Sequence, residues 1–574
     1  MERALDEILA TGRLPYPDAI AGVAGCIRDV GTHIELQLAF PSFRCELELV
    51  PANELIVEKS SRWTPRCTVT GTVFEGNVGH AARGAGTLID ADEADVDRAF
   101  IHLDDVELRV WRDGDQLRAF VGARQHDDVT LTAISTWTSI YTFHDFADVW
   151  HLRIPSARIE LELRAAFPDQ EVVTMTTSEP RWQGRCDVEG AMAGRFVKGV
   201  AYVEHAALGA KSMSDIFAAV PRETVRALHE ELPLPFTHES LLAMIGSHYE
   251  RYVRDVDLDE VERIVVAPIR EILDRKGKAW RSYAAVMCYY AMRGERQNDV
   301  VALLMALAEI IHVGSLIVDD VQDASPTRRG GPSTHVAHGV PLAINAGNFC
   351  YFVWQAWLAR LELPHGAKLS IYELYFDFMR VGHLGQALDI QGFTPAMADE
   401  IVETGDVALL TRQLTNVYVL KTGAPASVFA RIGAIVAGSN AAQLRAIADL
   451  FEALGIAFQI ADDIHNLKGF IGDAKHCEDL TGAKVTMPLL EAMRVLDRDA
   501  RRDLWDRITR CAAAPSLVPG IVETIEQCGA LTACRENAHA LIERAWQASS
   551  PAFEDSIAKV MLRSFCFYVV ESLG

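Results

Sequence analysis

The stretch LIVDDVQDASPTRRGG, which runs from Leu316 to Gly331, brings three aspartates and two arginines close together. On a helix, Asp319 and Asp323 lie one turn apart on the same face, where their like charges repel each other. An apolar run precedes the stretch, so we expect it to follow a buried helix. A cation must offset the repulsion between the acids, and Arg328 and Arg329 must face an anion.

A second acidic segment has a similar arrangement. FQIADDIHNLKG (458–469) also follows an apolar helical pattern and places Asp462 and Asp463 near its end, with Asn466 one turn after Asp462. Oxygen donors without a nearby histidine or cysteine cluster suit Mg²⁺, which keeps several waters and binds through carboxylates and substrate phosphates. A single acidic pair is more often a solvated helix end, but two such motifs in one helical region predict a magnesium site that holds a diphosphate.

Length and composition indicate a globular protein with more than one domain. The chain has 574 residues, of which 49% are apolar and 23% are charged, and this length exceeds that of an ordinary single domain. The net charge of −24 argues against nucleic acid or an anionic membrane surface as a general partner. Local basic segments still allow a small anion to bind.

Several features bear on the compartment. The start, MERALDEILATGR, lacks the basic segment and apolar core of a signal peptide. The eleven cysteines are scattered without a CxxC pair, which indicates reduced thiols. The apolar run VALLMALAEIIHVGSLIV (301–318) approaches membrane-spanning length, but it contains Glu309 and His312, so it predicts a buried core helix. We therefore expect a cytoplasmic protein without a transmembrane segment.

Up to about residue 205, apolar and polar residues alternate, as in half-buried antiparallel strands. Glycine-rich turns separate the alternating segments. Examples are HIELQLAF (33–40), RCELELV (44–50), VELRVW (106–111) and RIELEL (158–163). Residues 1–220 are therefore predicted to form an antiparallel β-rich module, either a barrel or a sandwich.

This module contains a weak internal repeat. RWTPRCTVTG (62–71) recurs as RWQGRCDVEG (181–190), and each copy continues through glycines into a strand-like segment, RGAGTLID (83–90) or KGVAYVEH (198–205). A repeat of this size predicts two similar β-modules packed as a pair.

From Pro221 the sequence pattern changes to a helical one. A proline-punctuated connector is followed by apolar residues at helical spacing almost to the C-terminus. Residues 221–574 are therefore predicted to form an all-α domain that is large enough to bury its own core.

The helical half resembles the trans-isoprenyl diphosphate synthases, the polyprenyl synthetase family, and within it the geranylgeranyl diphosphate synthases. The resemblance implies the all-α isoprenoid synthase fold and a prenyltransferase activity. The matching elements are GKAWR (277–281), EIIHVGSLIVDDVQD (309–323), RRGGPSTH (328–335), GQALD (385–389), KTG (421–423), FQIADDIHN (458–466) and CEDLTGAKVTMP (477–488), in family order.

The resemblance assigns the acids to a trinuclear Mg²⁺ site. The implied ligands are Asp319, Asp323 and Asp462, with Asp320 and Asp463 as supporting acids and with Asp389 and Gln386 orienting metal-bound water. It assigns the basic residues to two diphosphates. The residues implied for the allylic diphosphate are Arg328, Lys421 and Lys475, and those implied for isopentenyl diphosphate are Lys278, Arg281, His312 and Arg329.

Catalysis itself would rest on part of this set. The residues implied are Asp319, Asp323, Lys421, Gln459 and Asp462, with Thr422 and Gln459 lining the path of the carbocation. Taken alone, His312 on an apolar helix is more often a core histidine, and Lys421 suits a helix-end cap. Lys484 has acidic neighbours with which to pair, and it is left unassigned.

The implied reaction is ionisation of an allylic diphosphate, attack by the alkene of isopentenyl diphosphate and loss of a proton. Short-chain synthases often carry aromatic residues four or five positions before the first motif, where this chain has Ser315 and Gly314. The resemblance therefore implies room for a linear C20 (geranylgeranyl) product or a longer one. It also implies a homo-oligomer formed through the helical domain.

Two other hypotheses stay open. A class I terpene synthase on the same fold would ionise a preformed prenyl diphosphate and cyclise it, but it would not need a pocket for isopentenyl diphosphate. A non-catalytic partner subunit or isoprenoid-binding protein would have no reason to concentrate acids in two motifs.

The segment GRCDVEGAMAGRFVKGVAYVEHAAL (184–208) resembles the closing part of the lipocalin-like carotenoid hydratases and related fungal cyclases. The β-rich module has no recognisable triad, metal spacing or phosphate loop, so its function stays open. Its His80, Glu189, Glu204 and His205 are expected to be exposed strand residues, with a polar cluster in a barrel mouth as the alternative.

Overall fold

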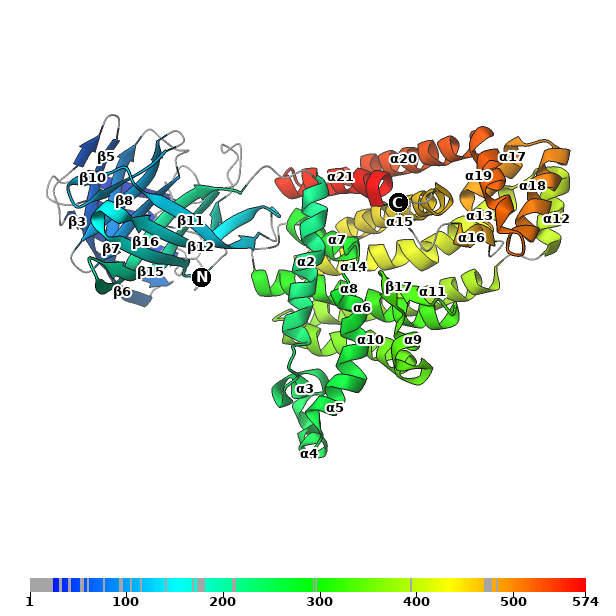
Figure 1. Ribbon diagram of the computed structural model, residues 1–574, viewed down its shortest axis with the longest axis horizontal. Helices are drawn as coiled ribbons and strands as arrows, with labels where there is room; N and C mark the ends of the chain where they lie inside the picture. Colours follow the sequence, from blue (N-terminus) through cyan, green and yellow to red (C-terminus); the bar gives the residue numbers. More distant parts are fainter. Residues whose placement is uncertain are drawn as a thin grey trace. The chain divides into compact units, whose positions relative to one another are not determined.

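Contacts within the chain divide it into two compact units, Met1–Lys211 and Ser212–Gly574, which Figure 1 shows as a β-rich unit and a helical unit. The structure is a computed structural model. It describes residues 24–29, 34–39, 43–51, 56–58, 61–75, 78–91, 97–103, 106–113, 116–139, 142–167, 170–172, 181–208, 213–292, 294, 297–392, 395–468, 477–481 and 484–573.

The boundary lies before the residue predicted from the sequence. Helix α2 (Met213–Glu231) belongs to the helical unit and contains Pro221, which was expected to begin the connector. A proline inside a helix costs roughly 3 kcal/mol. Packing offsets this cost, because Phe217 of the same helix stacks on Tyr568 with ring centres 4.3 Å apart.

The larger sheet of the β-rich unit is a curled antiparallel half-barrel (Figure 1). Nine strands follow one another in the order β10-β9-β8-β7-β16-β15-β13-β12-β11, and a tenth, β14, pairs with β15. Within the described residues β10 and β11 do not pair with each other, so the sheet stays open. The strands are β7 (Arg98–Leu103), β8 (Glu107–Asp113), β9 (Gln116–Val121), β10 (Arg124–His126), β11 (Thr130–Thr138), β12 (Asp145–Ile154), β13 (Ile159–Ala165), β14 (Glu171–Val172), β15 (Arg181–Met192) and β16 (Arg195–Ala206), with a 3-10 turn η2 (Pro155–Ala157).

The predicted alternation forms the core of this sheet. In β13, Ile159, Leu161 and Leu163 are buried while Glu160 between them is exposed. The buried face also carries Trp182, and together these side chains belong to one apolar cluster. The period-two prediction is therefore confirmed for this segment.

One acidic and one basic residue of β16 are buried, although both were expected to be exposed. Glu204 is only 2% exposed and pairs with Arg98, and His205 is 8% exposed. The ring of His205 lies 5.3 Å from that of Trp150 and 5.5 Å from that of Trp182. Both residues were expected to be exposed, but the curl of the sheet buries both faces of β16 at this end.

The smaller sheet has the order β1-β2-β3-β5-β4, with β6 paired to β5. Its strands are β1 (Ala24–Asp29), β2 (Ile34–Ala39), β3 (Phe43–Pro51), β4 (Ile56–Glu58), β5 (Ser61–Glu75) and β6 (Val78–Ala91). This order matches that of β11-β12-β13-β15 with β14 and β16 paired to β15. The internal repeat therefore corresponds to a repeated strand topology.

Register supports the same correspondence. Gly71 of the first copy lies opposite Leu47 of β3, and Gly190 of the second lies opposite Leu161 of β13. The copies differ at Pro65, which lies within a register shift between Thr64 and Cys67, because proline has no N–H for a strand ladder.

The C-terminal unit is helical, as predicted. Its helices are α2, α3 (His238–Ile245), α4 (Glu250–Val253), α5 (Leu258–Val261), α6 (Ala267–Asp274), α7 (Trp280–Ala291), α8 (Asn298–Gln322), α9 (Thr334–His338), α10 (Val340–Arg360), α11 (His365–Gln391), α12 (Pro395–Thr404), α13 (Ala408–Tyr418), α14 (Ala424–Val436), α15 (Ala441–Lys468), α16 (Glu478–Thr481), α17 (Met487–Val495), α18 (Arg498–Cys511), α19 (Val518–Gln527), α20 (Ala530–Ser549) and α21 (Ile557–Tyr568). The short elements are η3 (Ser247–Tyr249), η4 (Glu262–Val266), η5 (Val419–Gly423), η6 (Pro515–Leu517), η7 (Ser550–Ala552), η8 (Val569–Leu573) and the hairpin β17 (Thr327–Arg328) and β18 (Gly331–Pro332).

Helices α8 and α15 carry the two acidic motifs and form the centre of this unit (Figure 1). Helix α8 packs against α7 and α10, and α15 packs against α14 and α20. Two stretches, Asp299–Gln322 and Ala408–Val436, are long and apolar enough to cross a membrane by length and composition alone. Most of each is buried, 72% and 56% respectively, as in the core helices of a folded domain.

Candidate active site

The first acidic motif lies at the C-terminal end of α8. Asp319 is in its last turn and Asp323 caps it, so both carboxylates lie at the negative end of the helix dipole. Partial desolvation and then the charge of Asp319 raise the pKa of Asp323 above its ordinary value. The two acids are therefore unfavourably placed by themselves, and nearby donors offset part of that cost.

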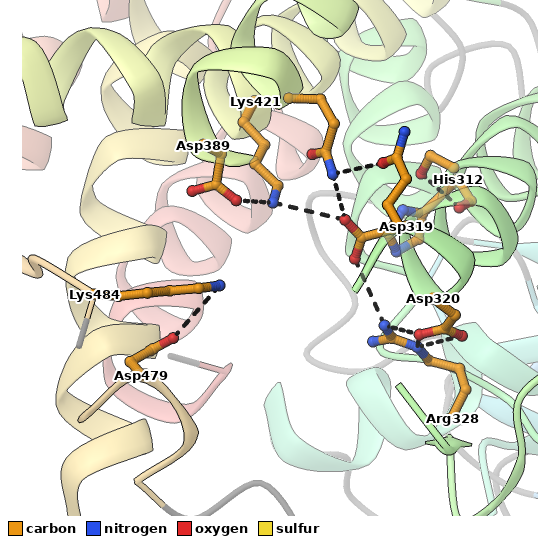
Figure 2. Close-up of polar contacts among 11 residues, drawn as sticks. His312, Asp319, Asp320, Arg328, Asp389, Lys421, Asp479 and Lys484 are labelled. Atoms are coloured by element: carbon orange, nitrogen blue, oxygen red, sulfur yellow. Dashed lines mark hydrogen bonds and ion pairs between the residues drawn. The ribbon is translucent and has the colours of Figure 1, made fainter. Parts of the chain in front are cut away.

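Three side chains bring these donors to Asp319 from other elements (Figure 2). Gln386 Nε2 donates to Oδ1 at 2.7 Å, Lys421 Nζ lies 3.8 Å from Oδ1, and Arg328 Nη2 lies 3.6 Å from Oδ2. Lys421 Nζ also pairs with Asp389 Oδ2 at 2.6 Å. Burial alone would lower the pKa of Lys421, but Asp319 and Asp389 outweigh it and raise the pKa. The ammonium group therefore stays charged.

Asp320 faces the protein instead of this group. It is fully buried, and Arg328 donates Nε–H to its Oδ1 at 2.8 Å and its Oδ2 at 3.0 Å. Adjacent residues on a helix point about 100° apart, so Asp319 and Asp320 face different neighbours. Asp320, which the sequence grouped with the metal-binding acids, is therefore not placed to ligate a metal and instead orients Arg328.

Arg328 is the last residue of strand β17, and Arg329 is the first residue of the tight turn that follows it. In the hairpin of β17 and β18, Arg329 and Gly330 have φ angles of 50° and 76°, as both central positions of a type I′ turn require. Arg275 Nη1 donates to the main-chain oxygen of Arg328 at 3.1 Å and helps to hold the hairpin. The turn sends the two guanidinium groups apart, and Arg329 pairs with Glu309 at 2.7 Å.

Arg329 reaches a second cationic pocket. Glu309, which sequence reasoning used only against a membrane span, is 2% exposed there and holds Arg329. Gly277 lies under the guanidinium group, because a Cβ at this position would come within 2.1 Å of Nη2. Lys276 and Ala279 on the same loop have φ angles of 57° and 48°. Such left-handed non-glycine residues are strained and concentrate at functional sites.

Three further predicted residues belong to this pocket. Burial lowers the pKa of Arg281 to about 10, so it remains charged at neutral pH. Burial, and then the charges of Arg281 and Arg329, lower the pKa of His312 well below its ordinary value, so its ring is neutral. Lys278 Nζ lies 5.3 Å from the ring centre of Phe458. The pocket therefore combines cations with one neutral hydrogen-bonding ring.

Lys421 and Thr422 lie on η5, a π-helical turn between α13 and α14. Single π turns often occur at functional sites. A Cβ on Gly385 of α11 would lie 2.9 Å from the N atom of Lys421, and a Cβ on Gly455 of α15 would lie 2.3 Å from the Cα of Gly423. Glycines on two helices therefore allow the backbone of the turn to be held on both sides.

The two acids of the second motif also diverge. Asp462 is exposed, and its charge acts on Arg281, so it lies near the second pocket. Asp463 is buried and accepts hydrogen bonds from the hydroxyl of Tyr418 and from the N–H of Met487, the latter at 3.0 Å. Burial raises the pKa of Asp463 to about 8. Asp463, the other predicted supporting acid, thus faces the protein and is not open to a metal.

Lys484 is a site residue that sequence reasoning left unassigned. Figure 2 shows Lys484 and Asp479 facing the group around Asp319, and Lys484 Nζ lies 3.9 Å from Asp479 Oδ1. Its charge also acts on Asp323. Its place in the CEDLTGAK segment was the available signal. Lys475, which was predicted to contact the allylic diphosphate, lies outside the described residues.

Both charged groups open onto one cavity with a volume of about 190 Å³. Its charged and hydrogen-bonding lining includes Arg281, His312, Asp319, Gln322, Gln386, Lys421 and Thr422. Its remaining walls are largely apolar and are formed by Ile311, Ser315, Leu316, Val318, Tyr351, Phe378, Met379, Gly382, His383, Pro425 and Phe429. A molecule with an anionic head and a hydrocarbon tail matches this division.

Ser315 lines the cavity, but Gly314 does not. A Cβ on Gly314 would lie 2.6 Å from the Cβ of Cys350 and 2.9 Å from the main-chain oxygen of Gly347, both on α10. Gly314 therefore allows α8 and α10 to approach closely. The prediction that both positions leave room for a hydrocarbon chain is corrected, because only Ser315 faces the cavity.

Comparison with known proteins agrees with this architecture. Residues 262–525 match the family model of polyprenyl synthetase. A geranylgeranyl pyrophosphate synthase of Penicillium paxilli is 26% identical over 290 residues, which is 50% of this chain and 72% of that protein. A short chain isoprenyl diphosphate synthase of Methanocaldococcus jannaschii is 29% identical over 277 residues, which is 47% of this chain and 76% of that protein.

A solved structure shares the fold of the helical unit. It is a geranylgeranyl pyrophosphate synthase from Corynebacterium glutamicum complexed with isoprenyl diphosphate and magnesium, with a TM-score of 0.50 and 22% identity. The match covers 61% of this chain and 98% of that one. Residues 262–525 of the helical unit are thus similar to the polyprenyl synthetases, and these matches indicate a trans-prenyltransferase.

Proposed function

We propose that the protein condenses isopentenyl diphosphate with an allylic diphosphate, with Mg²⁺, to give a linear isoprenyl diphosphate. The observation that carries this proposal is the pairing of two anion sites on one cavity. Asp319, Lys421 and Arg328 form one site, and Arg281 with Arg329 forms the other. A cyclase ionises a single diphosphate, so it would leave the second site without a role.

The donors at the first site fit Mg²⁺. Asp319 and Asp323 offer carboxylate oxygens near its cations, and Asp462 offers them from the second motif, near Arg281. Among the described residues, no three acidic, histidine or cysteine side chains lie close enough to hold a metal by themselves. This suits an ion that keeps several waters and takes the rest of its ligands from a substrate phosphate. When bound, Mg²⁺ would neutralise charge that develops on the leaving diphosphate.

Different residues of the chain would then bind the two diphosphates. Lys421 and Arg328 would hold the allylic diphosphate and offset its growing negative charge as the carbon–oxygen bond breaks. Arg281 and Arg329 would fix isopentenyl diphosphate, and neutral His312 would donate a hydrogen bond to it. The alkene then attacks the allylic carbon, and a proton leaves to an oxygen of the departed diphosphate.

We propose a C20 product, geranylgeranyl diphosphate, or a longer one. The small side chain of Ser315 leaves the upper wall of the cavity open below the first motif. Tyr351, Phe378 and Phe429 also bring aromatic rings to the wall and would limit growth. The names of the relatives from Penicillium and Corynebacterium support the same product class.

We also propose that the helical unit forms a homo-oligomer. Large apolar side chains are exposed on α10 and α11, among them Phe352 (66%), Leu369 (58%), Phe376 (49%) and Leu384 (54%). Exposed apolar side chains in such number on two adjacent elements favour association. Sedimentation of the purified protein at two concentrations would measure its mass in solution.

The decisive experiment offers the purified protein Mg²⁺ and dimethylallyl, geranyl, farnesyl or geranylgeranyl diphosphate, each with and without isopentenyl diphosphate. Products are analysed before and after phosphatase treatment. We expect a prenyl alcohol longer than the one that the supplied substrate itself gives, only after phosphatase treatment and only when isopentenyl diphosphate is present. A hydrocarbon formed without isopentenyl diphosphate would support the cyclase instead.

A further inference from the structure

Asp463 has a buried carboxyl group with hydrogen-bond partners on three different elements. Its Oδ2 accepts from the hydroxyl of Tyr418, the last residue of α13, and from the N–H of Met487, the first residue of α17, at 3.0 Å. Its Oδ1 accepts from Gln459 Nε2 at 3.4 Å. The side chain is 4% exposed, so these contacts decide its orientation.

The same hydrogen-bond network holds both ends of the π turn η5. Tyr418 immediately precedes the turn, and Thr422 lies within it and donates Oγ1–H to Gln459 Oε1 at 3.1 Å. Asp463 thus holds one end of the turn directly and the other end through Gln459. Lys421 lies between these two anchored residues.

The position of Lys421 depends on this turn. Its Nζ reaches Asp389 on α11 at 2.6 Å and Asp319 on α8 at 3.8 Å. Gly385 and Gly455 allow close backbone contact with the turn, but van der Waals contact alone leaves the turn free to slide along its neighbours. Directional hydrogen bonds at its two ends remove this freedom.

We propose that Asp463 is a positioning residue that fixes the π turn and so aims Lys421 at the diphosphate. This role rests on the proposed function only for what Lys421 does. Asp463 therefore differs from Asp462, its exposed neighbour, which we assign to the metal side of the site.

The hydrogen-bond pattern gives a sharp prediction for Asp463→Asn. The amide oxygen can accept from Tyr418 and Met487 as the carboxylate does, and its NH₂ can donate to Gln459 once that amide flips. Thr422 then accepts instead of donating. The network survives without a charge, whereas a metal ligand would lose its carboxylate.

The experiment compares Asp463→Asn, Asp463→Leu and Tyr418→Phe, with Asp462→Asn as the metal-side control. We expect Asp463→Asn to keep kcat within roughly threefold, because its network remains complete. Asp463→Leu should lower kcat by about a hundredfold through misplacement of Lys421. Neither should change the Mg²⁺ concentration for half-maximal rate, which Asp462→Asn should raise.

Amide hydrogen exchange across residues 418–423 supplies a readout that does not depend on turnover. We expect faster exchange in Asp463→Leu and Tyr418→Phe than in the unmodified protein, and unchanged exchange in Asp463→Asn. If Asp463→Leu does not fold, the comparison of Tyr418→Phe with Asp463→Asn carries the same test.

Two results would overturn the proposal. In the first, Asp463→Asn behaves like Asp462→Asn, with a raised requirement for Mg²⁺. In the second, the π turn exchanges at the same rate in Tyr418→Phe, in Asp463→Leu and in the unmodified protein. A protein that showed no condensation at all would refute the proposed function, but the exchange measurements would still decide whether Asp463 holds the turn.

Discussion

We expect Tyr351→Ala to lengthen the product by about one isoprene unit. Tyr351 extends from α10 into the wall of the cavity, is 9% exposed, and has its ring centre 6.0 Å from that of His383 on α11. A hydrocarbon tail that grows away from the cations meets this ring pair. Removing the larger ring opens the wall without touching the groups that we assign to the diphosphates.

The magnitude follows from the space gained. An engineered apolar cavity of about 150 Å³ holds one benzene molecule, and truncation of a buried aromatic ring leaves a space of that order, enough for about one five-carbon unit. The cost in folding stability is about 3–5 kcal/mol. The backbone should persist, because Trp354 Nε1 (2.8 Å) and Tyr375 Oη (2.5 Å) donate to the main-chain oxygen of Tyr351, which alanine retains.

The assay measures the chain lengths of dephosphorylated products formed from farnesyl diphosphate and excess isopentenyl diphosphate. Tyr351→Phe keeps the ring and serves as the matched control, with the same distribution as the unmodified protein. Ser315→Phe should shorten the product, because it adds a ring at another residue that lines the cavity. An unchanged distribution in both Tyr351→Ala and Ser315→Phe would refute our identification of this cavity as the tail site.

Four other predictions concern charge and domain organisation. Arg281→Ala should raise the Michaelis constant for isopentenyl diphosphate roughly ten- to a hundredfold, since a charge-assisted hydrogen bond is worth about 1.5–3 kcal/mol; equal changes for the allylic substrate would contradict two separate anion sites. Asp323→Asn should strengthen the binding of inorganic pyrophosphate in the absence of Mg²⁺ and weaken it in the presence of Mg²⁺, as measured by calorimetry. Weaker binding in both conditions would contradict a metal role for Asp323. Burial and the charges of Arg281 and its neighbours depress the pKa of His312 in the folded protein. The free energy of unfolding should therefore be constant above the ordinary pKa near 6.5 and should decrease as the pH drops below it, by up to about 1.4 kcal/mol at pH 5.5. Urea unfolding followed by helical circular dichroism should show this loss, and His312→Gln should remove it. Residues 212–574 should fold and condense substrates alone, and a helical but inactive fragment would show that the β-rich unit contributes to the site.

The parts of the fold that were predictable depend on local patterns. The alternation in RIELEL set the buried face of β13, because side chains of a strand alternate regardless of the neighbouring strand. The two copies of the repeat, around RWTPRC and RWQGRC, lie on β5 and β15, which have equivalent places in the two sheets. The structure divides the chain after Lys211, before the predicted Pro221. The stacking of Phe217 on Tyr568, a residue near the C-terminus of the sequence, has no local signal.

The site shows the same division. Both acidic motifs were found from residue type and spacing, and the cations were assigned by the resemblance. Of the predicted residues that the structure describes, one cavity is lined by Arg281, His312, Asp319, Gln386, Lys421 and Thr422. Residue type and spacing alone do not say which of two adjacent acids faces the cavity, because that depends on what packs on the other side. The resemblance made this distinction when it named Asp319 and Asp462 as ligands and Asp320 and Asp463 as supporting acids. The side chain of Asp320 is occupied by Arg328 from a hairpin, and the role of Gly314 is decided by Gly347 on another helix.

The repulsion in LIVDDVQD now has a physical account. Arg328 neutralises the buried Asp320. Asp319 lies near the cations of Arg328 and Lys421 and accepts a hydrogen bond from Gln386. Asp323 remains exposed at a helix C-terminus, where both the dipole and Asp319 disfavour its charge. A diphosphate that approaches without a metal meets this acid as well as the cations, and the two effects oppose each other. With Mg²⁺ on the acid, as we propose, the same geometry would attract the diphosphate, so the unfavourable charge would make diphosphate binding conditional on the metal.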